Sequence, residues 1–488
     1  MRTKLLTLLA CALATVASAQ TGSDLPDMGS PASAVLSLNE EYRLGAMIVR
    51  NLRDQNQIIE DPELDEYLQA LGSRLAAHVP EGGQRFHFFV VRDSTINAFA
   101  LPGGFIGVNY GLILATANES ELASVLAHEI AHVTQRHIAR MVRAQGRQSI
   151  ATTAAIVAAI LIGAMSGGAG GDVVQGAIAA AQGAAVQQQI NFTRAHEYEA
   201  DRVGIGILAA AGFDPKAMAD FFETMGRRVG LAQAQVPELL QTHPVTTNRI
   251  AEARNRAAQF DHPKSPESLS YALARERLRV ITAPRETDVH AYYARLREQR
   301  EPGLGERYGE ALALMNAGRP AEAARILDEL WSQHESVPLL AAALGQAQMA
   351  AGLTNDAIAT FERAITLSPR NVPITVRYAE ALMRMGDAKK AHALLLDLFN
   401  NVPPTPDQIR LTALAASAAG DIADAYYYMA EYHIASGDLP LAMQQLELAL
   451  AVPNLTPVQR QRFEARLEML REARANQPRR MRSSDHER

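Results

Sequence analysis

Apolar residues recur at helical spacing through most of this chain of 488 residues. One such segment follows Asp61-Pro62, a pair that is typical of a helix start, and its apolar positions are Leu64, Tyr67, Leu68, Leu71 and Leu75. Positions three or four residues apart share one helical face, so we expect a helix that runs to about Val79. A second helix is expected from about Glu119 to Ala144, with a buried face of Leu122, Val125, Leu126 and Ile130.

Between these two helices the pattern changes to short β-like runs. Phe86–Val91 is expected to form one strand. Asn97–Leu101 and Phe105–Val108 flank the turn Pro102-Gly103-Gly104 and are expected to form a hairpin. The N-terminal part of the chain is therefore expected to be mainly α-helical with a small β-sheet, which is an α+β fold.

The C-terminal third repeats with a period of 34 residues. Gly318, Gly352, Gly386 and Gly420 have this spacing, and an alanine follows each glycine after five residues. A 34-residue period with small residues where two helices cross indicates tetratricopeptide repeats. We expect an all-α solenoid over residues 303–475, which either binds peptide or protein on its inner face or serves as a spacer.

The N-terminus has the features of an export signal. Arg2 and Lys4 precede an apolar run from Leu5 to Val16, and small residues precede Gln20. We expect residues 1–19 to be a signal peptide that is removed on export.

Cys11 is the only cysteine, and it lies within this segment. Its surroundings loosely resemble a lipoprotein box, so lipid attachment at Cys11 is an alternative. If the signal is removed, the mature chain has no cysteine, and any metal must be held by His, Asp and Glu.

Charge and composition narrow the classes of partner. The net charge is −6, and it becomes −8 without Arg2 and Lys4 (−6 − 2), which does not fit a nucleic-acid-binding protein. The basic tail at 476–488 is expected to be solvated. Residues 148–192 carry a single charge, Asp172, and are expected to form an apolar helical hairpin packed near the cleft. The alternatives are a mobile element beside the active site or peripheral contact with a membrane surface.

The stretch His-Glu-Ile-Ala-His at 128–132 is a candidate for metal chemistry. Two histidines four residues apart project from one face of a helix, so His128 and His132 can bind one zinc ion. Glu129 is placed to take a proton from the water that attacks a peptide bond. The alternative is an ordinary amphipathic helix with two exposed histidines, so a third ligand is needed to support the hypothesis.

Glu197 is the candidate third ligand, because a catalytic zinc site has three protein ligands and one open position. Glu197 and Asp201 share one helical face, so Asp201 can accept a hydrogen bond from a ligand histidine. His196 competes for the ligand role, and Glu199 is an unlikely partner because it lies on another side of the helix. We expect one Zn²⁺ per chain.

Two further histidines are ambiguous. His243 precedes a helix that is expected to start at Thr246 or Thr247, and it can reach the metal or the oxyanion, or it is an ordinary loop histidine. Arg249, one turn into that helix, is a candidate oxyanion group. His137 falls on a different helical face from the ligand pair and is expected to be a surface residue.

A strand at a sheet edge beside the cleft would suit a peptide substrate. Asn97, Ala98, Phe99 and Ala100 are the candidates for this strand, because the main-chain hydrogen bonds of an added strand do not depend on side-chain identity.

Three blocks of the chain resemble the HtpX-type zinc metallopeptidases. These are His128–His132, Glu197–Asp201 and Thr242–Pro244, and the segment Asn97–Gly104 is also similar to that family. With the export signal and the repeats, the resemblance covers nearly the whole mature chain. It implies that His128, His132 and Glu197 bind zinc, that Asp201 supports a ligand, and that His243 can occupy the fourth position and keep the enzyme latent.

The resemblance also implies a location and a role. The location is the periplasm, and the role is the degradation of misfolded or stalled outer-membrane β-barrel proteins. The repeats would contact the substrate or the assembly machinery. The expected organisation is a zincin-type protease domain at 20–262, a helical linker at 263–302 and the repeats at 303–475, with the hairpin at 148–192 shaping access to the cleft.

Two functions of different classes remain open. The first is an exported zinc endopeptidase, and the second is a repeat-based chaperone or adaptor in which proteolysis is secondary. The endopeptidase is favoured because Glu129 and an open set of ligands have no structural purpose, whereas a structural zinc has a closed set of four ligands.

Overall fold

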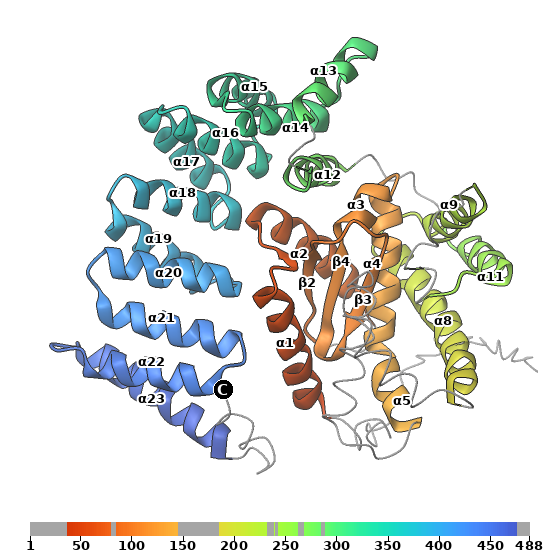
Figure 1. Cartoon of the computed structure of the whole chain (residues 1–488), viewed down its shortest axis with the longest axis horizontal. Helices are drawn as coiled ribbons and strands as arrows, with labels where there is room; N and C mark the ends of the chain where they lie inside the picture. The colour runs from red at the N-terminus through yellow and green to blue at the C-terminus, as the bar shows by residue number, and fades with distance from the viewer. Residues whose placement is uncertain are drawn as a thin grey trace, which may run out of the picture.

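A computed structural model describes most of the chain (Figure 1). The described residues are 37–79, 84–144, 185–231, 239, 243–261, 268–284 and 288–475. The predicted signal peptide, Cys11, the basic tail and most of the predicted hairpin at 148–192 lie outside these ranges.

A four-stranded mixed sheet lies at the centre of the N-terminal domain. Its strands are β1 (Ile58–Ile59), β2 (His87–Val91), β3 (Ala98–Leu101) and β4 (Phe105–Asn109), in the order β1-β2-β4-β3. β2 and β4 are parallel, whereas the other two pairs are antiparallel. The predicted strands and hairpin are confirmed, and β3 is an edge strand.

The alternation of side chains along the strands gives the sheet two apolar faces. Phe89 and Val91 point to one face and pack with α1 (Leu38–Asp54). Phe88 and Val90 point to the other face and join a larger core with α2 (Pro62–Ala76) and α4 (Glu119–Thr134). The predicted start of α2 is confirmed, with Asp61 as N-cap. The sheet therefore supports α4 from behind, and α4 carries the metal motif.

The helix that was expected to run from Glu119 to Ala144 is two helices, so this prediction is wrong. α4 ends at Thr134 and α5 covers His137–Ala144. Arg136 between them has φ 52°, which is the left-handed region that non-glycine residues seldom adopt. No glycine or proline marks this break, so the apolar pattern alone did not show it.

The described part of the N-terminal domain also contains α8 (Ala185–Ala210), α9 (Ala217–Leu231) and α11 (Thr247–Ala257). A short α3 (Tyr110–Ala115) precedes α4. α8 packs along α4, and the two backbones are close at Gly204, where a Cβ would lie 3.1 Å from the amide nitrogen of His128. This close approach places side chains of α8 directly against the metal motif.

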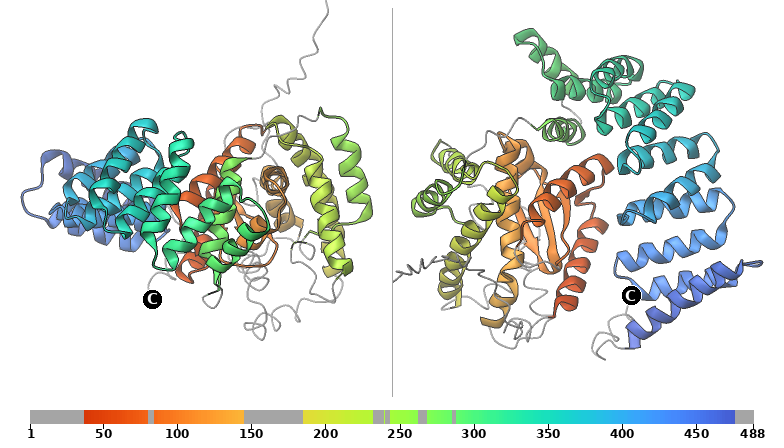
Figure 2. Two further views of the ribbon diagram at one scale, coloured as in Figure 1. Left: turned by 90° about the horizontal axis from the view of Figure 1, so that it is seen from above. Right: turned by 180° about the vertical axis from the view of Figure 1, so that it is seen from behind.

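The C-terminal domain is a solenoid of antiparallel helix pairs (Figures 1 and 2). Its helices are α14 (Leu304–Asn316), α15 (Pro320–Gln333), α16 (Pro338–Ala350), α17 (Thr354–Leu367), α18 (Val372–Arg384), α19 (Ala388–Phe399), α20 (Pro406–Ala418), α21 (Ile422–Ala435), α22 (Leu439–Ala451) and α23 (Pro457–Ala475). The glycines that define the 34-residue period end the first helix of each pair with φ between 75° and 86°. The repeat prediction is confirmed.

The predicted helical linker contains α12 (Leu269–Ile281) and α13 (Val289–Gln299). α12 belongs to two cores, because Tyr271 packs in the core of the N-terminal domain and Leu273 in that of the solenoid. This shared helix joins the two domains firmly.

The solenoid curves beside α1 and α2, as both views in Figure 2 show. Arg377 of α18 donates to Glu63 of α2, and Asn371 donates to Glu66 at 2.7 Å. The far end of the solenoid returns to α1, where Arg50 donates to Asp438 at 3.0 Å. Contacts from the middle and from the C-terminal part of the solenoid fix the position of the repeats relative to the N-terminal domain.

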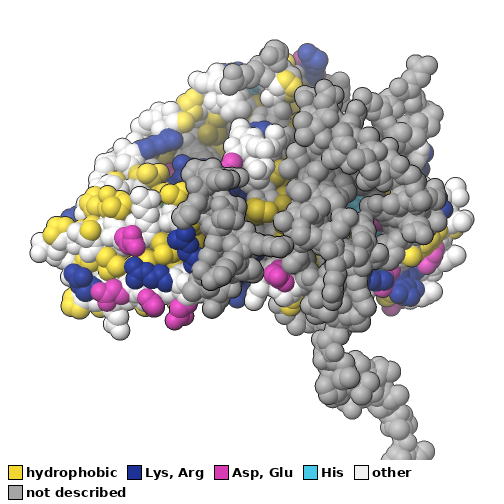
Figure 3. Space-filling model, turned by 60° about the horizontal axis from the view of Figure 1, so that its bottom comes forward, with side chains coloured by type: hydrophobic (Ala, Val, Ile, Leu, Met, Phe, Trp, Pro, Cys, Tyr) yellow, Lys and Arg dark blue, Asp and Glu magenta, His cyan; other side chains and the backbone are white. Residues whose placement is uncertain are grey.

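Apolar side chains lie among charges of both signs at the left of the surface shown in Figure 3. In the last repeats, the exposed apolar residues include Leu441, Leu448, Val458 and Met469. No helix of the described ranges is long and apolar enough to cross a membrane.

Candidate metal centre

Two histidines of α4 and one carboxylate of α8 converge at the interface of these helices. The Nε2 atoms of His128 and His132 are 3.0 Å apart, because residues four apart lie above one another on a helix. Glu197 Oε2 lies 3.3 Å from Nε2 of His128, and Glu197 Oε1 lies 3.4 Å from Nε2 of His132. Ligands placed tetrahedrally at 2.0–2.1 Å from zinc are about 3.3 Å apart, so these atoms fit one zinc ion.

His243 brings a fourth ligand atom to the same place. Its Nδ1 lies 3.0 Å from both carboxylate oxygens of Glu197 and 3.3 Å from Nε2 of His128. Among the described residues, the ligand atoms of these four side chains all lie within 4.8 Å of one another. The amide of His243 donates to the carbonyl of Leu239, whose own amide donates to Ile96 beside β3. The segment that carries His243 is thus tied to the edge of the sheet.

Asp201 and Arg249 hold the ligands from behind. Asp201 Oδ1 lies 2.9 Å from Nδ1 of His128, and Arg249 donates to both oxygens of Asp201 at 2.7 Å. A further nitrogen of Arg249 lies 3.0 Å from Glu197. The predicted start of α11 is confirmed, because Thr246 is its N-cap and accepts from the amide of Arg249.

The oxyanion role expected of Arg249 stays a prediction, although Arg249 lines the pocket beside His128. Its guanidinium is only 2% exposed and is engaged by Asp201, Glu197 and the carbonyl of Pro244. The structure therefore gives Arg249 the task of fixing the two carboxylates.

The charges around His128 favour a cation at this point. Burial lowers the pKa of His128, but hydrogen bonds to Asp201 and Glu197 and their charges outweigh burial and raise it to about 10. The pKa of Glu197 lies well below its usual value, because His243 and the ligand histidines outweigh the opposing effect of burial. A divalent cation among these atoms would compensate the negative charges of Glu197 and Asp201 in place of a protonated histidine.

Glu129 faces the site from the ligand helix. Its side chain is 1% exposed, and its Oε1 has no hydrogen-bond partner among the described residues. Nε2 of His243 is 3.6 Å from this oxygen. A buried carboxylate with an unused oxygen beside the ligand set is suited to accept a proton.

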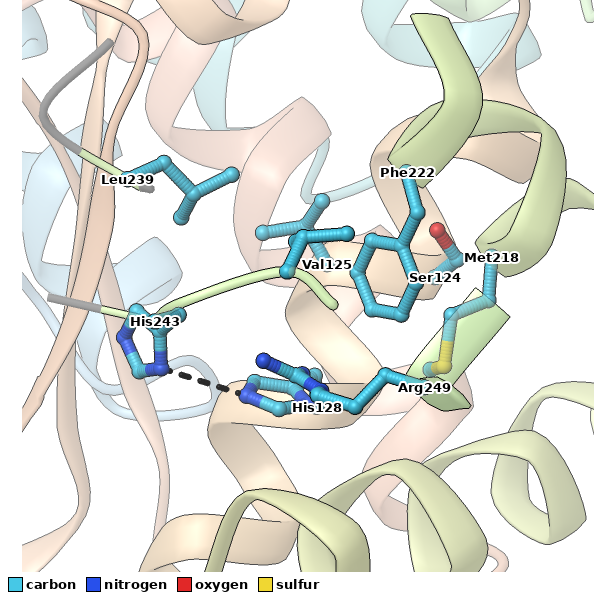
Figure 4. A pocket seen from close by; sticks show the side chains of 9 residues that line it. Ser124, Val125, His128, Met218, Phe222, Leu239, His243 and Arg249 are labelled. Carbon is cyan, nitrogen blue, oxygen red and sulfur yellow. Dashed lines mark hydrogen bonds between the residues drawn. The ribbon is translucent and has the colours of Figure 1, made fainter. Parts of the chain in front are cut away.

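An apolar pocket adjoins His128 (Figure 4). Figure 4 shows His243 beside His128 and Arg249 close to the same ring, with apolar side chains around them. The apolar lining is Val125, Met218, Phe222, Leu239 and Val245. The volume of the pocket is about 20 Å³, which leaves room for about one water molecule next to the metal centre.

His137 and Glu199 take part in a cluster that the sequence did not reveal. His137 is 4% exposed, so the expectation of a surface residue is wrong. Its ring stacks on His196 with centroids 4.1 Å apart, and its Nδ1 lies 2.9 Å from Nδ1 of His132. Burial, followed by the charges of His132, His196 and Arg140, lowers the pKa of His137 to about 2. His196 itself does not join the group of ligand atoms.

Comparison with known proteins agrees with this geometry. Residues 62–257 match peptidase family M48, and residues 348–417 match a tetratricopeptide repeat family. The beta-barrel assembly-enhancing protease of Escherichia coli (strain K12) is 34% identical over 471 residues, which cover 93% of each chain. That of Yersinia pestis is 33% identical over 452 residues, covering 92% of this chain and 91% of the relative. The mitochondrial metalloendopeptidase OMA1 of Schizosaccharomyces pombe is 31% identical over 187 residues, covering 38% of this chain and 50% of the relative.

The chain therefore belongs to the M48 zinc metallopeptidases that carry tetratricopeptide repeats, and within them to the family of the beta-barrel assembly-enhancing proteases. His128, His132 and Glu197 form its zinc-binding group.

Proposed function

We propose that this chain is an exported endopeptidase of the periplasm that degrades misfolded or stalled outer-membrane β-barrel proteins. The observation that carries this proposal is the buried His128-His132-Glu197 group beside Glu129, within a chain that is similar over more than nine-tenths of its length to proteases named for β-barrel assembly. The export signal expected at residues 1–19 supports the location.

In the proposed reaction Glu129 is the general base. A zinc ion held by His128, His132 and Glu197 would supply a Lewis acid that polarises the scissile carbonyl. Glu129 removes the proton of the attacking water and delivers it to the leaving amine. Asp201 and Arg249 keep the ligand side chains in place, so little rearrangement is needed during the reaction.

The edge of the sheet offers a place for the substrate backbone. We assign this role to Asn97, Ala98, Phe99 and Ala100, which lie at or in the edge strand β3 next to α4. A stalled β-barrel protein has unpaired strands, and a strand can add to this edge through main-chain hydrogen bonds.

The repeats are proposed to bring substrate, or the assembly machinery, to the peptidase. The exposed apolar residues of the last repeats support a binding role for this surface. The alternative function, a chaperone or adaptor in which proteolysis is secondary, would use the same surface without the metal centre.

Trapping with Glu129→Gln separates the two functions. The variant should keep zinc and fold, lose proteolysis, and retain uncleaved β-barrel proteins when it is expressed in the native envelope and cross-linked. Identifying the retained proteins by mass spectrometry, with Glu197→Gln as a zinc-free control, tests the substrate class. A cell that tolerates Glu129→Gln but not changes in the repeats would favour the adaptor and contradict the endopeptidase.

We further propose that His243 holds the enzyme latent. The proposal is supported by the position of its Nδ1, 3.0 Å from Glu197 and 3.3 Å from His128, where a fourth ligand would sit. His243→Ala should raise the basal rate of cleavage of an unfolded protein, measured with purified enzyme and zinc. A lower rate would contradict latency and would identify His243 as a group that acts in the transition state.

A further inference from the structure

The two ligand histidines are supported in different ways. His128 turns its Nδ1 directly to the carboxylate of Asp201, at 2.9 Å. His132 turns its Nδ1 to another imidazole, Nδ1 of His137, also at 2.9 Å. His137 in turn places its Nε2 3.2 Å from Oε2 of Glu199. The carboxylate that supports His132 is therefore one histidine further away.

If His132 binds zinc through Nε2, its contacts with His137 and Glu199 call for one arrangement of protons. His132 presents Nε2 to the ligand group, so its neutral ring carries the proton on Nδ1. That N–H then donates to Nδ1 of His137, whose own proton must be on Nε2. This second N–H donates to Glu199, which also accepts from Arg140 at 2.8 Å. Each nitrogen and the carboxylate has a defined donor or acceptor role.

The break between α4 and α5 brings His137 to this position. On a continuous helix, a residue five positions after His132 would lie about 140° around the axis from it. The left-handed Arg136 ends α4 and turns the chain, so His137 faces back toward His132. A backbone conformation of this kind is unfavourable for a non-glycine residue and persists where the surrounding structure requires it.

We propose that His137, held by Glu199, is a positioning residue that fixes the ring orientation and the tautomer of the zinc ligand His132. This proposal deepens the proposed function, since it rests on zinc binding at the same centre. Partners of metal-binding histidines typically change metal affinity 10- to 100-fold when they are removed, so we expect about that effect here.

The simpler explanation is that His137 only fills space between α5 and α8, where it stacks on His196 with ring planes 9° apart. Two substitutions separate these roles. His137→Phe keeps the stacked ring but removes the acceptor. His137→Asn loses the ring but keeps an acceptor, because its amide oxygen is as many bonds from Cβ as Nδ1 is.

The measurement is the zinc dissociation constant of the purified full-length chain, obtained by competition with a chelator. We expect His137→Phe to weaken zinc binding by about 10- to 100-fold and His137→Asn to stay within about threefold of the wild type. The absorption bands of the cobalt-substituted chain should shift in His137→Phe and stay close to wild type in His137→Asn. The opposite order, with Asn weaker than Phe, would overturn the proposal and leave a packing role.

Two further variants keep the test independent of folding effects at position 137. Glu199→Leu removes the acceptor of His137 Nε2–H and should weaken zinc binding by a smaller factor. His196→Phe keeps the stacked ring and should leave zinc binding unchanged. Unchanged affinity in both His137→Phe and Glu199→Leu would contradict the proposal. A wild-type chain that binds no zinc would instead refute the proposed function itself.

Discussion

Two of the buried charge clusters in the described part of the chain differ in the balance of positive and negative groups. At the junction of the two domains, two arginines face two carboxylates: Asp61, Glu63, Arg277 and Arg377. Arg277 donates to both oxygens of Asp61 at 2.7 Å and to Glu63 at 3.0 Å, and Arg377 donates to Glu63. The formal charges cancel, and no further ion is needed.

The metal centre also contains buried carboxylates and a guanidinium group, but its negative charges outnumber its positive ones. Glu129, Glu197 and Asp201 are buried with a single guanidinium, that of Arg249. With neutral histidines, as metal ligation requires, the cluster carries a formal charge of −2, which one divalent cation cancels. The comparison teaches that a balanced cluster joins structural elements, whereas a deficit of positive charge beside converging imidazoles indicates a metal site.

The largest effect on stability is expected at the junction. Arg277→Met leaves Asp61 and Glu63 buried with half of their compensation, and removing one partner of a buried ion pair typically costs about 3–5 kcal/mol. A lower melting temperature by calorimetry and faster limited proteolysis near α12 should follow. Arg319→Met, which breaks an exposed pair with Glu322, is the matched control and should change neither. If the Arg277→Met chain is as stable as the wild type, then the cluster at the junction does not hold the two domains together.

Removal of zinc should lower the stability of chains whose metal centre is intact, whether or not the junction is intact. A ligand present at about 1,000 times its dissociation constant adds roughly 4 kcal/mol to the folded state, so a chelator should lower the melting temperature of the wild type. Arg277→Met should keep this response in full, because distant sites contribute additively. Glu197→Gln should lose it. If the chelator has the same small effect on all three chains, then the charge deficit is not a metal site.

The smallest effect concerns Glu66, which accepts from Asn371 across the junction. Burial raises the pKa of Glu66 to about 7, so its contribution to stability is present below pH 4.5 and is lost as the pH rises through about 7. Glu66→Gln stays neutral and should therefore raise the melting temperature at pH 8 but not at pH 4.5.

Asp61 gives the opposite sign and serves as the control for this pH dependence. Burial raises its pKa, but Arg277 outweighs burial and holds it below the usual value, so its contribution is present above pH 3.8 and lost at lower pH. Asp61→Asn should therefore lower the melting temperature at pH 8. If Glu66→Gln and Asp61→Asn change the melting temperature in the same direction at pH 8, then the two pKa values are not shifted in opposite directions.

Much of the fold was predictable because it follows from local patterns. The strands are short apolar runs, and the repeats place a glycine after the first helix of each pair. His128 and His132 are four residues apart within one helix. Glu197 and Asp201 could be predicted for the same reason, because the two residues are four apart and lie on one face of α8. These features depend on neighbours in sequence.

The parts that escaped prediction depend on contacts between distant segments. The hydrogen bonds between Arg249 and Asp201 of α8 join residues 48 positions apart, so local patterns did not show them. His137 was expected at the surface, because its burial depends on a left-handed residue, Arg136, that no turn signal marks. The ion pairs between α2 and α18 join residues 314 positions apart, and periodicity carries no information about them.

The central claim is that the cluster with a charge deficit is the working centre of a zinc endopeptidase. The most direct test measures bound zinc and the cleavage of an unfolded β-barrel protein for the purified wild type and for Glu129→Gln. The account predicts one zinc per chain in both proteins, with cleavage reduced at least about 100-fold in the variant, because only the general base has been removed. Cleavage by Glu129→Gln at the wild-type rate, or a folded wild type without zinc, would contradict it.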